Sequence, residues 1–185
     1  MKSREDIYIE LLILKCRNGD RTAFDQLVNL LERRLFFFVR RLARSEEDAW
    51  DILQQTWIDV YRRIDSLRNT SRVLPWLYHI ARNKAAGHMR DQYRHAAVPL
   101  DEVEGDIPDC SYNGSFDEVD AAEVRAALEK LSVPHREVLT LHFLEDFNLE
   151  EISAITGIPV GTVKSRLHYA KRALGKAMKR EWLSR

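Results

Sequence analysis

LEEISAITGIPVGTVKSRLHYAKRAL, residues 149–174, predicts two helices joined by a tight turn. Asn148 is expected to cap the first helix, because Glu151 follows it at the spacing of a capping box. Gly157 supplies the left-handed or closely approached backbone that a sharp turn needs. Pro159 stands where a second helix can begin without losing a hydrogen bond. The stretch is therefore a candidate helix-turn-helix.

The second helix of this pair separates an apolar face from a polar one. Val163, Leu167, Ala170 and Leu174 recur at helical spacing and are expected to face inward. The outward residues are then mainly hydroxyl-bearing or basic: Thr162, Lys164, Ser165, Arg166, His168, Tyr169, Lys171 and Arg172. Such a face near a helix N-terminus suits the major groove of DNA. The alternative is an ordinary helical hairpin with a solvated basic face.

The composition fits a globular protein of one medium or two small domains. Of the 185 residues 45% are hydrophobic, and no apolar run approaches the roughly 20 residues of a membrane span. The N-terminus does not resemble a signal peptide, so we expect a cytoplasmic protein without membrane insertion. Cys16, Cys110 and the histidines lack metal-site spacing, and no cofactor is expected. The two cysteines either form one disulfide or stay reduced, as in a cytosol.

The formal net charge of zero conceals an uneven distribution. Residues 96–124 hold nine of the 29 acidic residues and no lysine or arginine. The rest of the chain therefore has 20 acidic residues against 29 basic ones, an excess of nine positive charges. Proline, glycine and few large apolar residues in the acidic segment are typical of a linker. Two basic bodies joined by a flexible acidic connector are expected.

Helix signals occur on both sides of the connector, whereas no stretch alternates as a strand does. Capping residues and three-to-four spacing predict helices over 3–16, 20–42, 45–64, 75–94, 115–131 and 134–146, followed by the helix-turn-helix. Residues 65–74, DSLRNTSRVL, are expected to form a loop. The predicted fold is all-α, with an N-terminal helical bundle over 1–95, a linker over 96–116 and a C-terminal helix-turn-helix bundle over 117–185.

Four segments together resemble the extracytoplasmic-function group of the bacterial sigma-70 family. They read GDRTAFDQLV (19–28), DAWDILQQTWIDVYRRIDSLR (48–68), WLYHIARNKA (76–85) and LSVPHREVLTLHFLEDFNLEEISAITGIPVGTVKSRLHYAKRAL (131–174). They occur in the family's order and span nearly the whole chain. The resemblance implies a sigma factor, not an enzyme, with region 2-like and region 4-like domains. Such a factor binds core RNA polymerase and directs transcription from promoters by recognising −10 and −35 elements.

In the first domain the resemblance implies a polymerase-docking helix over 48–63. It docks on the β′ clamp helices, and the residues expected to take part are Asp48, Asp51, Gln54, Gln55, Trp57, Asp59 and Tyr61. The family often has Glu at the position of Gln55 and Phe at that of Trp57. Opposed charges would raise the encounter rate and set the orientation of docking. The alternative is a solvated helix face.

The segment over 65–94 resembles the family's reader of the melted −10 strand. A single strand offers unstacked bases and phosphates to pockets and basic side chains. The expected contacts are Arg68, Asn69, Ser71 and Arg72 in the loop and Arg82, Asn83, Lys84 and Arg90 on the helix. Trp76 and Tyr78 are either core residues or stacking platforms. Capture of a strand that is already separated requires no ATP, and the chain has no GxxxxGK[ST] motif.

In the second domain the helix-turn-helix resembles the family's reader of the −35 element. The expected contacts are Gly161, Thr162, Lys164, Ser165, Arg166, Tyr169 and Arg172. Tyr169 departs from the family, in which a basic residue is common at this position, so it either loses a contact or touches a thymine methyl. The implied partners are promoter DNA, the β flap of polymerase and an anti-sigma factor. The linker either threads polymerase channels or is a solubilising spacer.

Two other classes of protein remain as alternatives. An operator-binding repressor or activator would dimerise and bind duplex DNA alone, but the linker lacks dimerisation heptads. An all-α enzyme would need a nucleophile elbow, a metal-ligand spacing or a phosphate-binding loop, and the sequence has none of these.

Overall fold

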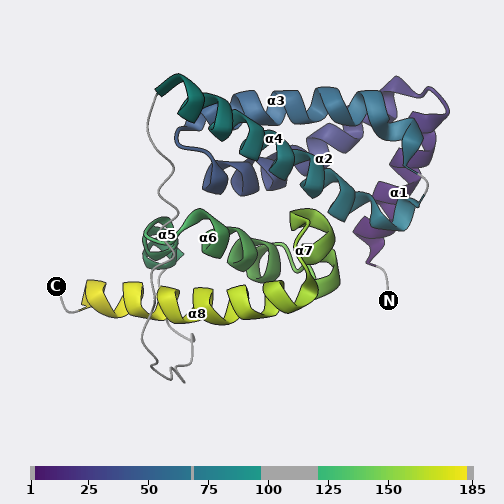
Figure 1. Cartoon of the computed structure of the whole chain (residues 1–185). Helices are drawn as coiled ribbons and strands as arrows, with labels where there is room; N and C mark the ends of the chain where they lie inside the picture. The colour runs from purple at the N-terminus through teal and green to yellow at the C-terminus, as the bar shows by residue number, and fades with distance from the viewer. Residues whose placement is uncertain (1–2, 68, 97–120, 183–185) are drawn as a thin grey trace. The chain divides into compact units, whose positions relative to one another are not determined.

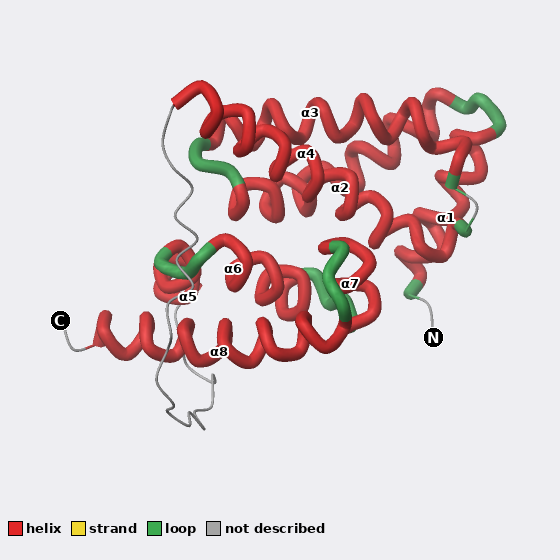
Figure 2. The backbone as a smooth tube through the Cα atoms, viewed as in Figure 1, coloured by secondary structure: helices red, strands yellow, loops and turns green. Residues whose placement is uncertain are grey.

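A computed structural model of the chain describes residues 3–67, 69–96 and 121–182. These residues are helical with short connections, and no strand occurs among them, as Figure 2 shows. They fall into two compact units, one mainly of residues before 96 and the other mainly of residues after it (Figure 1). The expected all-α fold is confirmed. Most of the expected linker and the expected Ser115–Glu118 cap lie outside the described residues.

The first three helices begin at the predicted capping residues. Helix α1 spans Arg4–Arg17, α2 spans Arg21–Leu42 and α3 spans Glu46–Arg63. The Ser3 hydroxyl accepts a bond from the Asp6 amide, and the Asp6 carboxylate accepts one from the Ser3 amide. Asp20 and Ser45 cap α2 and α3 through their side chains. Caps of this kind satisfy amides that the helix itself leaves unpaired.

The fourth helix begins earlier than the proline rule indicates. Two 3₁₀ turns, η1 (Ile64–Ser66) and η2 (Thr70–Arg72), occupy the expected loop, and α4 spans Val73–Ala96. Pro75 therefore lies within the first turn of α4 instead of opening it. The first turn accepts proline because its amides have no partner within the helix.

The core of the first unit lies between α1, α2, α3 and α4. Leu27, Leu31, Leu35 and Phe38 form the inward stripe of α2, and each is at most 1% exposed. Phe38 packs on the fully buried Tyr78 of α4, with ring centroids 5.0 Å apart. Tyr78 is thus a core residue, whereas Trp76 is half-buried.

Over the residues that the structure describes, the second unit is built from four helices and a wider π turn. Helix α5 spans Ala121–Glu129, α6 spans Val133–Leu139, α7 spans Leu149–Thr156 and α8 spans Val160–Trp182. The π turn η3 (Thr140–Leu144) extends α6. Helix α8 packs against both α5 and α6, and Figure 1 shows α6 lying along it.

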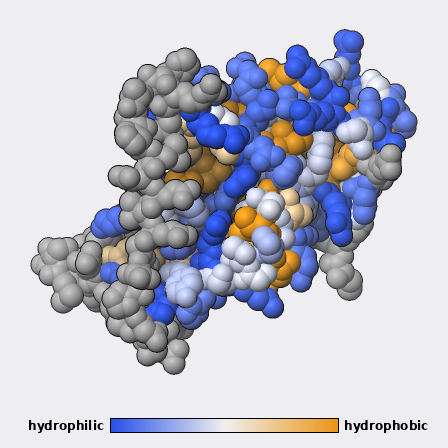
Figure 3. Space-filling view, viewed as in Figure 1, coloured by the Kyte–Doolittle hydropathy of each residue, from blue (hydrophilic) through white to orange (hydrophobic). Residues whose placement is uncertain are grey.

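None of the described helices combines the length and the apolar character that crossing a bilayer requires. On the face drawn in Figure 3, hydrophilic residues predominate, and small hydrophobic patches lie between them.

Candidate functional site

The helix-turn-helix forms through the local interactions that the sequence predicts. The Asn148 side chain accepts from the Glu151 amide at 2.9 Å, and the Glu151 carboxylate accepts from the Asn148 amide at 2.9 Å. Gly157 has a φ of +74°, the left-handed conformation that glycine adopts without strain. Pro159 directly precedes α8 and is not its first residue. The Ser153 hydroxyl donates to the Ile158 carbonyl at 2.6 Å and closes the turn.

The apolar face of α8 is buried as predicted. Val163 and Ala170 are inaccessible to solvent, and Leu167 and Leu174 are almost so. These four side chains belong to the buried core of the unit, in which α8 packs against α5 and α6. The orientation of the outer face is therefore set by the hydrophobic core of the unit.

The seven residues expected to read the −35 element all lie on α8. Five of them are exposed: Gly161, Thr162, Lys164, Ser165 and Tyr169. The Ser165 hydroxyl donates to the Thr162 carbonyl at 3.0 Å, so it turns back toward its own helix. Arg166 and Arg172 are half-buried and are thus partly engaged with the domain itself. The structure thus places all seven candidate residues along one helix, and Lys164 is the basic residue among them that is exposed.

Arg166 lies close enough to α6 to influence a histidine there. Burial lowers the pKa of the half-buried His135, and the positive charge of Arg166 lowers it further. Both effects disfavour the imidazolium form. The charge of Arg166 therefore acts on His135 within the unit, whereas Lys164 is exposed to solvent.

The expected docking residues of α3 separate onto three sides of the helix. Asp48 and Asp59, about three turns apart, point toward α4. An Asp48 carboxylate oxygen lies 2.9 Å from His88 Nε2, and an Asp59 oxygen lies 2.9 Å from Lys84 Nζ. Asp59 also lies 3.4 Å from the Arg63 guanidinium. These two carboxylates tie α3 to α4.

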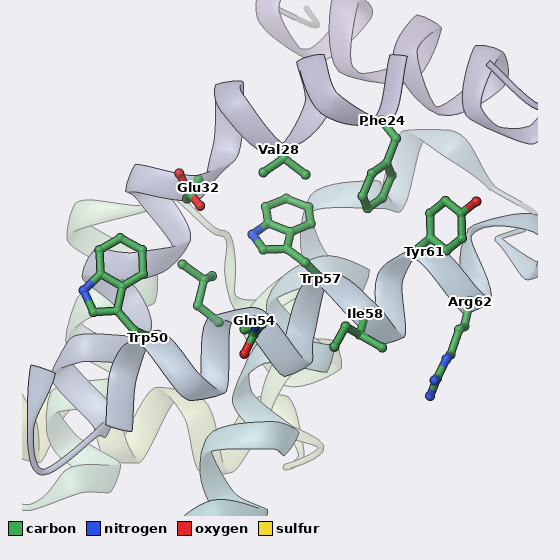
Figure 4. A pocket seen from close by; sticks show the side chains of 10 residues that line it. Phe24, Val28, Glu32, Trp50, Gln54, Trp57, Ile58, Tyr61 and Arg62 are labelled. Atoms are coloured by element: carbon green, nitrogen blue, oxygen red, sulfur yellow. The ribbon is translucent and has the colours of Figure 1, made fainter. Parts of the chain in front are cut away.

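The other docking residues face outward or line a groove. Asp51 and Gln55 are exposed. Gln54, Trp57 and Tyr61 line a groove of about 550 Å³ between α2 and α3, drawn in Figure 4. Trp57 was expected as a contact residue, but it is only 8% exposed because Phe24 packs against it edge-on, with ring centroids 6.1 Å apart. Tyr61 is 56% exposed.

Sequence reasoning missed the remaining walls of this groove: Phe24, Val28, Glu32, Trp50, Leu53, Ile58 and Arg62. Trp50 is 47% exposed and stacks on Phe36, with ring centroids 4.2 Å apart. A signal was present in the sequence, because α3 carries more large apolar residues than one inward stripe requires. Surplus apolar residues on a surface indicate a partner.

In the expected −10 loop, two of the predicted residues bond to each other. The Asn69 side chain accepts from the Ser71 amide at 3.0 Å and from the Ser71 hydroxyl at 2.7 Å. Arg72 is exposed beside them. Arg68 lies outside the described residues. The local bonds form a compact polar turn just before α4.

The four candidate residues of α4 lie on two sides of the helix. Arg82, Asn83 and Arg90 share one side by helical spacing. The Asn83 amide nitrogen lies 2.9 Å from His79 Nε2. Lys84 points the other way, toward Asp59. Lys84 therefore joins α4 to α3 through its ion pair with Asp59, a role that the spacing of residues along α4 did not indicate.

An exposed aromatic residue of the second unit also escaped prediction. Phe143 in η3 is 52% exposed, and Lys171 Nζ lies 4.9 Å from its ring centroid. The adjacent Leu144 is 48% exposed. The π turn places both side chains outward, and this local geometry could not be read from the spacing.

The free thiol of Cys16 is half-buried on α1. Burial raises the pKa of the Cys16 thiol, and the negative charge of Asp20 raises it further. Cys110 lies outside the described residues. Within the described ranges, no three metal-ligating side chains gather as a metal site would require.

Comparisons with known proteins match both units. The family model for sigma-70 region 2 matches residues 27–95, and the model for sigma-70 region 4 matches residues 121–174. The ECF RNA polymerase sigma-E factor of Escherichia coli is 31% identical over 182 residues, covering 92% of this chain and 94% of that protein. The RNA polymerase sigma-H factor of Pseudomonas aeruginosa is 30% identical over 178 residues, covering 90% and 92%.

Solved structures give the same result. The sigma factor RpoE of Bartonella quintana, solved in complex with the anti-sigma factor NepR, has a TM-score of 0.67 and 28% identity, covering 84% of this chain and 96% of that one. CnrH, solved with the cytosolic domain of CnrY, has a TM-score of 0.67 and 23% identity over 93% of this chain and 97% of that one, and shares the fold. The two matched regions occur in the family's order, and the relatives span nearly the full chain. The protein therefore belongs to the sigma-70 family, as an extracytoplasmic-function sigma factor.

Proposed function

We propose that this chain joins core RNA polymerase in the cytoplasm and directs it to promoters that carry a −35 and a −10 element. The observation that carries the proposal is the outer face of α8. Lys164, Thr162 and Ser165 are exposed near the helix N-terminus, directly above the buried stripe that fixes the orientation of the helix. A helix held in this way can present side chains to base edges in a major groove.

The −35 element is read by α8 and the −10 strand by the segment around η2 together with α4. Lys164 and Arg166 are the main −35 contacts, and Gly161 and Thr162 approach phosphates. Gly161 supports this role because a side chain there would meet nothing within 4 Å, so the backbone is open to a ligand. Arg72, Arg82 and Arg90 follow the phosphates of the melted strand.

Docking on polymerase uses the outward side of α3. The exposed Asp51 and Gln55 form its polar edge, and Gln54 and Tyr61 line the apolar groove beside it. The clamp helices of the β′ subunit are the proposed partner of this side, and the β flap is the proposed partner of the second unit. The chain does no covalent chemistry of its own in this scheme.

Regulation by an anti-sigma factor is part of the proposal. The related RpoE of Bartonella quintana was solved with such a partner. An anti-sigma factor would act by covering the surfaces that meet polymerase or DNA. Burial of the groove between α2 and α3 is one way to do so, because it removes exposed apolar surface from water.

In vitro transcription with purified bacterial core polymerase on a promoter library tests the function. The expected result is transcription from a subset of promoters that share two short elements, and only when this chain is present. A gel shift separates this function from that of a repressor. A repressor binds duplex DNA alone, whereas this chain should bind promoter DNA tightly only with core polymerase. Tight binding without polymerase, or no transcription, would contradict the proposal.

A further inference from the structure

Two polar contacts hold α4 against α3. An Asp59 oxygen lies 2.9 Å from Lys84 Nζ, and an Asp48 oxygen lies 2.9 Å from His88 Nε2. Asp48 and Asp59 are about three turns apart, so they lie on one side of α3 and are separated by about 16 Å. Lys84 and His88 are about one turn, or about 6 Å, apart on α4. Because the two contacts are separated along both helices, together they resist the rolling and tilting of α4 that a single contact would allow.

The apolar core holds only the first part of α4. Up to Asp91, the last residue of α4 whose side chain the structure describes, the final buried residue is Ala85, and residues 86–91 are half-buried or exposed. Gly87 weakens this part of the helix further, because glycine is a poor helix former. A side chain at Gly87 would meet nothing within 4 Å. The contact of His88 with Asp48 therefore ties to α3 a part of the helix that the buried core does not reach.

The residues proposed to meet the melted −10 strand lie on a different side of α4 from these contacts. Arg90 is exposed and lies in the part of the helix that follows Ala85. Helical spacing puts Arg90 about 120° around α4 from Lys84 and about 160° from His88. The two polar contacts are therefore on the back of the helix. A roll of the helix at this point would swing the Arg90 guanidinium away from the strand.

We propose that Lys84 and His88 are positioning residues, which fix the orientation of α4 beyond Ala85 for capture of the melted −10 strand. Neither side chain touches the strand. Each holds a carboxylate of α3, and both act through Arg90 on the opposite side of the helix. This inference rests on the proposed reading of the −10 element by α4 and adds the residues that orient its reading side.

The test compares two cations that share one carboxylate. Lys84→Met removes the partner of Asp59 on α4 and keeps a long side chain. The matched control is Arg63→Met, which removes the cation 3.4 Å from Asp59 on α3 itself. Each variant is assembled with core polymerase, and its binding of a labelled single-stranded oligonucleotide is measured by fluorescence anisotropy. The oligonucleotide carries the −10 element of a promoter found in the library, and core polymerase binding and thermal unfolding are measured separately.

The dissociation constant for the oligonucleotide is expected to rise roughly threefold in Lys84→Met, and roughly tenfold when His88→Ala is added, as for partly exposed ion pairs. Arg63→Met should change it by less than about 1.5-fold. Lys84→Arg keeps the charge and should bind as the unmodified chain does. Asp59→Asn should also weaken binding, roughly threefold, although it removes a negative charge that repels DNA. Core polymerase binding should stay unchanged in all of these variants.

Dependence on Arg90 separates positioning from general stability. In an Arg90→Ala background, Lys84→Met combined with His88→Ala should weaken binding by less than about threefold, because the side chain that they orient is gone. A purely structural role would instead lower the unfolding temperature and weaken binding by the same factor in both backgrounds. Asp59→Asn breaks the same contact and carries the test if Lys84→Met does not fold.

Four results would overturn the inference. Unchanged or stronger binding in Asp59→Asn would make Lys84 a direct phosphate contact. Equal losses in Lys84→Met and Arg63→Met, equal factors with and without Arg90, or a matching loss of core polymerase binding would each remove the positioning role. If the unmodified holoenzyme does not bind the oligonucleotide, the proposed function fails together with the inference. If it binds and the variants bind equally well, only the inference fails.

Discussion

Replacing Lys164 and Arg166 by alanine should impair promoter recognition and leave polymerase binding intact. Both side chains lie on the outer face of α8, but they differ in their surroundings. Lys164 is exposed, whereas Arg166 is half-buried and its charge acts on His135. Lys164→Ala is therefore a purely surface change, and Arg166→Ala also alters the interior of the second unit.

The magnitude follows from these surroundings. A good base contact is worth about 1–3 kcal/mol, and two independent contacts would give about 2–6 kcal/mol. Because Arg166 is shared with the domain, we expect the lower part of that range, about 2–4 kcal/mol. This corresponds to a loss of roughly 30- to 900-fold in the affinity of holoenzyme for a −35-dependent promoter. Where the lost contacts are to phosphate, the slope of the logarithm of the binding constant against the logarithm of the salt concentration should become shallower by about one per contact.

The assay compares two readouts on each variant. Holoenzyme binding to a labelled promoter is measured over a range of salt, and core polymerase binding is measured separately. The matched control is Lys171→Ala, which removes one exposed lysine farther along the same helix, where its ammonium lies over the Phe143 ring. A second check follows the His135 pKa by NMR, which should rise in Arg166→Ala because a nearby positive charge is gone.

Two results would refute the reasoning. One is an equal loss of core polymerase and promoter binding, which would place α8 in the polymerase interface. The other is a loss in Lys171→Ala as large as that in Lys164→Ala, since the position along the helix would then be irrelevant.

Three further predictions concern docking, the turn and pH. Replacing Asp51 and Gln54 by alanine should weaken core polymerase binding in a pull-down titration and spare DNA recognition; unchanged affinity would remove these residues from docking. Gly157→Ala should destabilise by roughly 1–2 kcal/mol because its φ of +74° is strained for other residues, whereas Gly161→Ala should be neutral or stabilise by up to about 0.5 kcal/mol in urea denaturation while it weakens promoter binding. In the folded protein the pKa of His135 lies below its ordinary value of 6.5, so the unfolded chain binds more protons as the pH falls through 6.5 toward that lowered value. The free energy of unfolding should therefore fall over this window. His135→Gln should abolish that part of the loss, as denaturation at several pH values would show.

Much of the fold could be predicted because its signals are local. Ser3, Asp20, Ser45 and Asn148 cap helices through bonds that span two or three residues. A capping side chain and its amide partner are neighbours in the sequence, so the pattern specifies the bond directly. The predicted start of α4 at Pro75 was wrong, because the local signal there is less specific than a cap. Proline is tolerated throughout the first turn, so it marks that turn without identifying its first residue.

The polar residues of α3 illustrate what local patterns cannot determine. Their spacing shows which of them share a side of the helix, but not which neighbour covers that side. Asp59 meets Lys84 and Asp48 meets His88 only because α4 folds back beside α3. Trp57 became buried for the same reason, since Phe24 of α2 packs against it.

The sequence by itself determined the helix-turn-helix, its outward cationic face, the all-α class and the division of charge between an acidic connector and two basic bodies. These features depend on residues within a few positions of one another, or on composition. Only the tertiary structure decided that α2 and α3 leave an apolar groove and that two carboxylates of α3 bind α4. It also decided that the indole nitrogen of Trp57 is buried with no hydrogen-bond partner among the residues that the structure describes. Each of those depends on contacts between helices far apart in the chain, and burial assigns a side chain to core or surface only after the helices have packed.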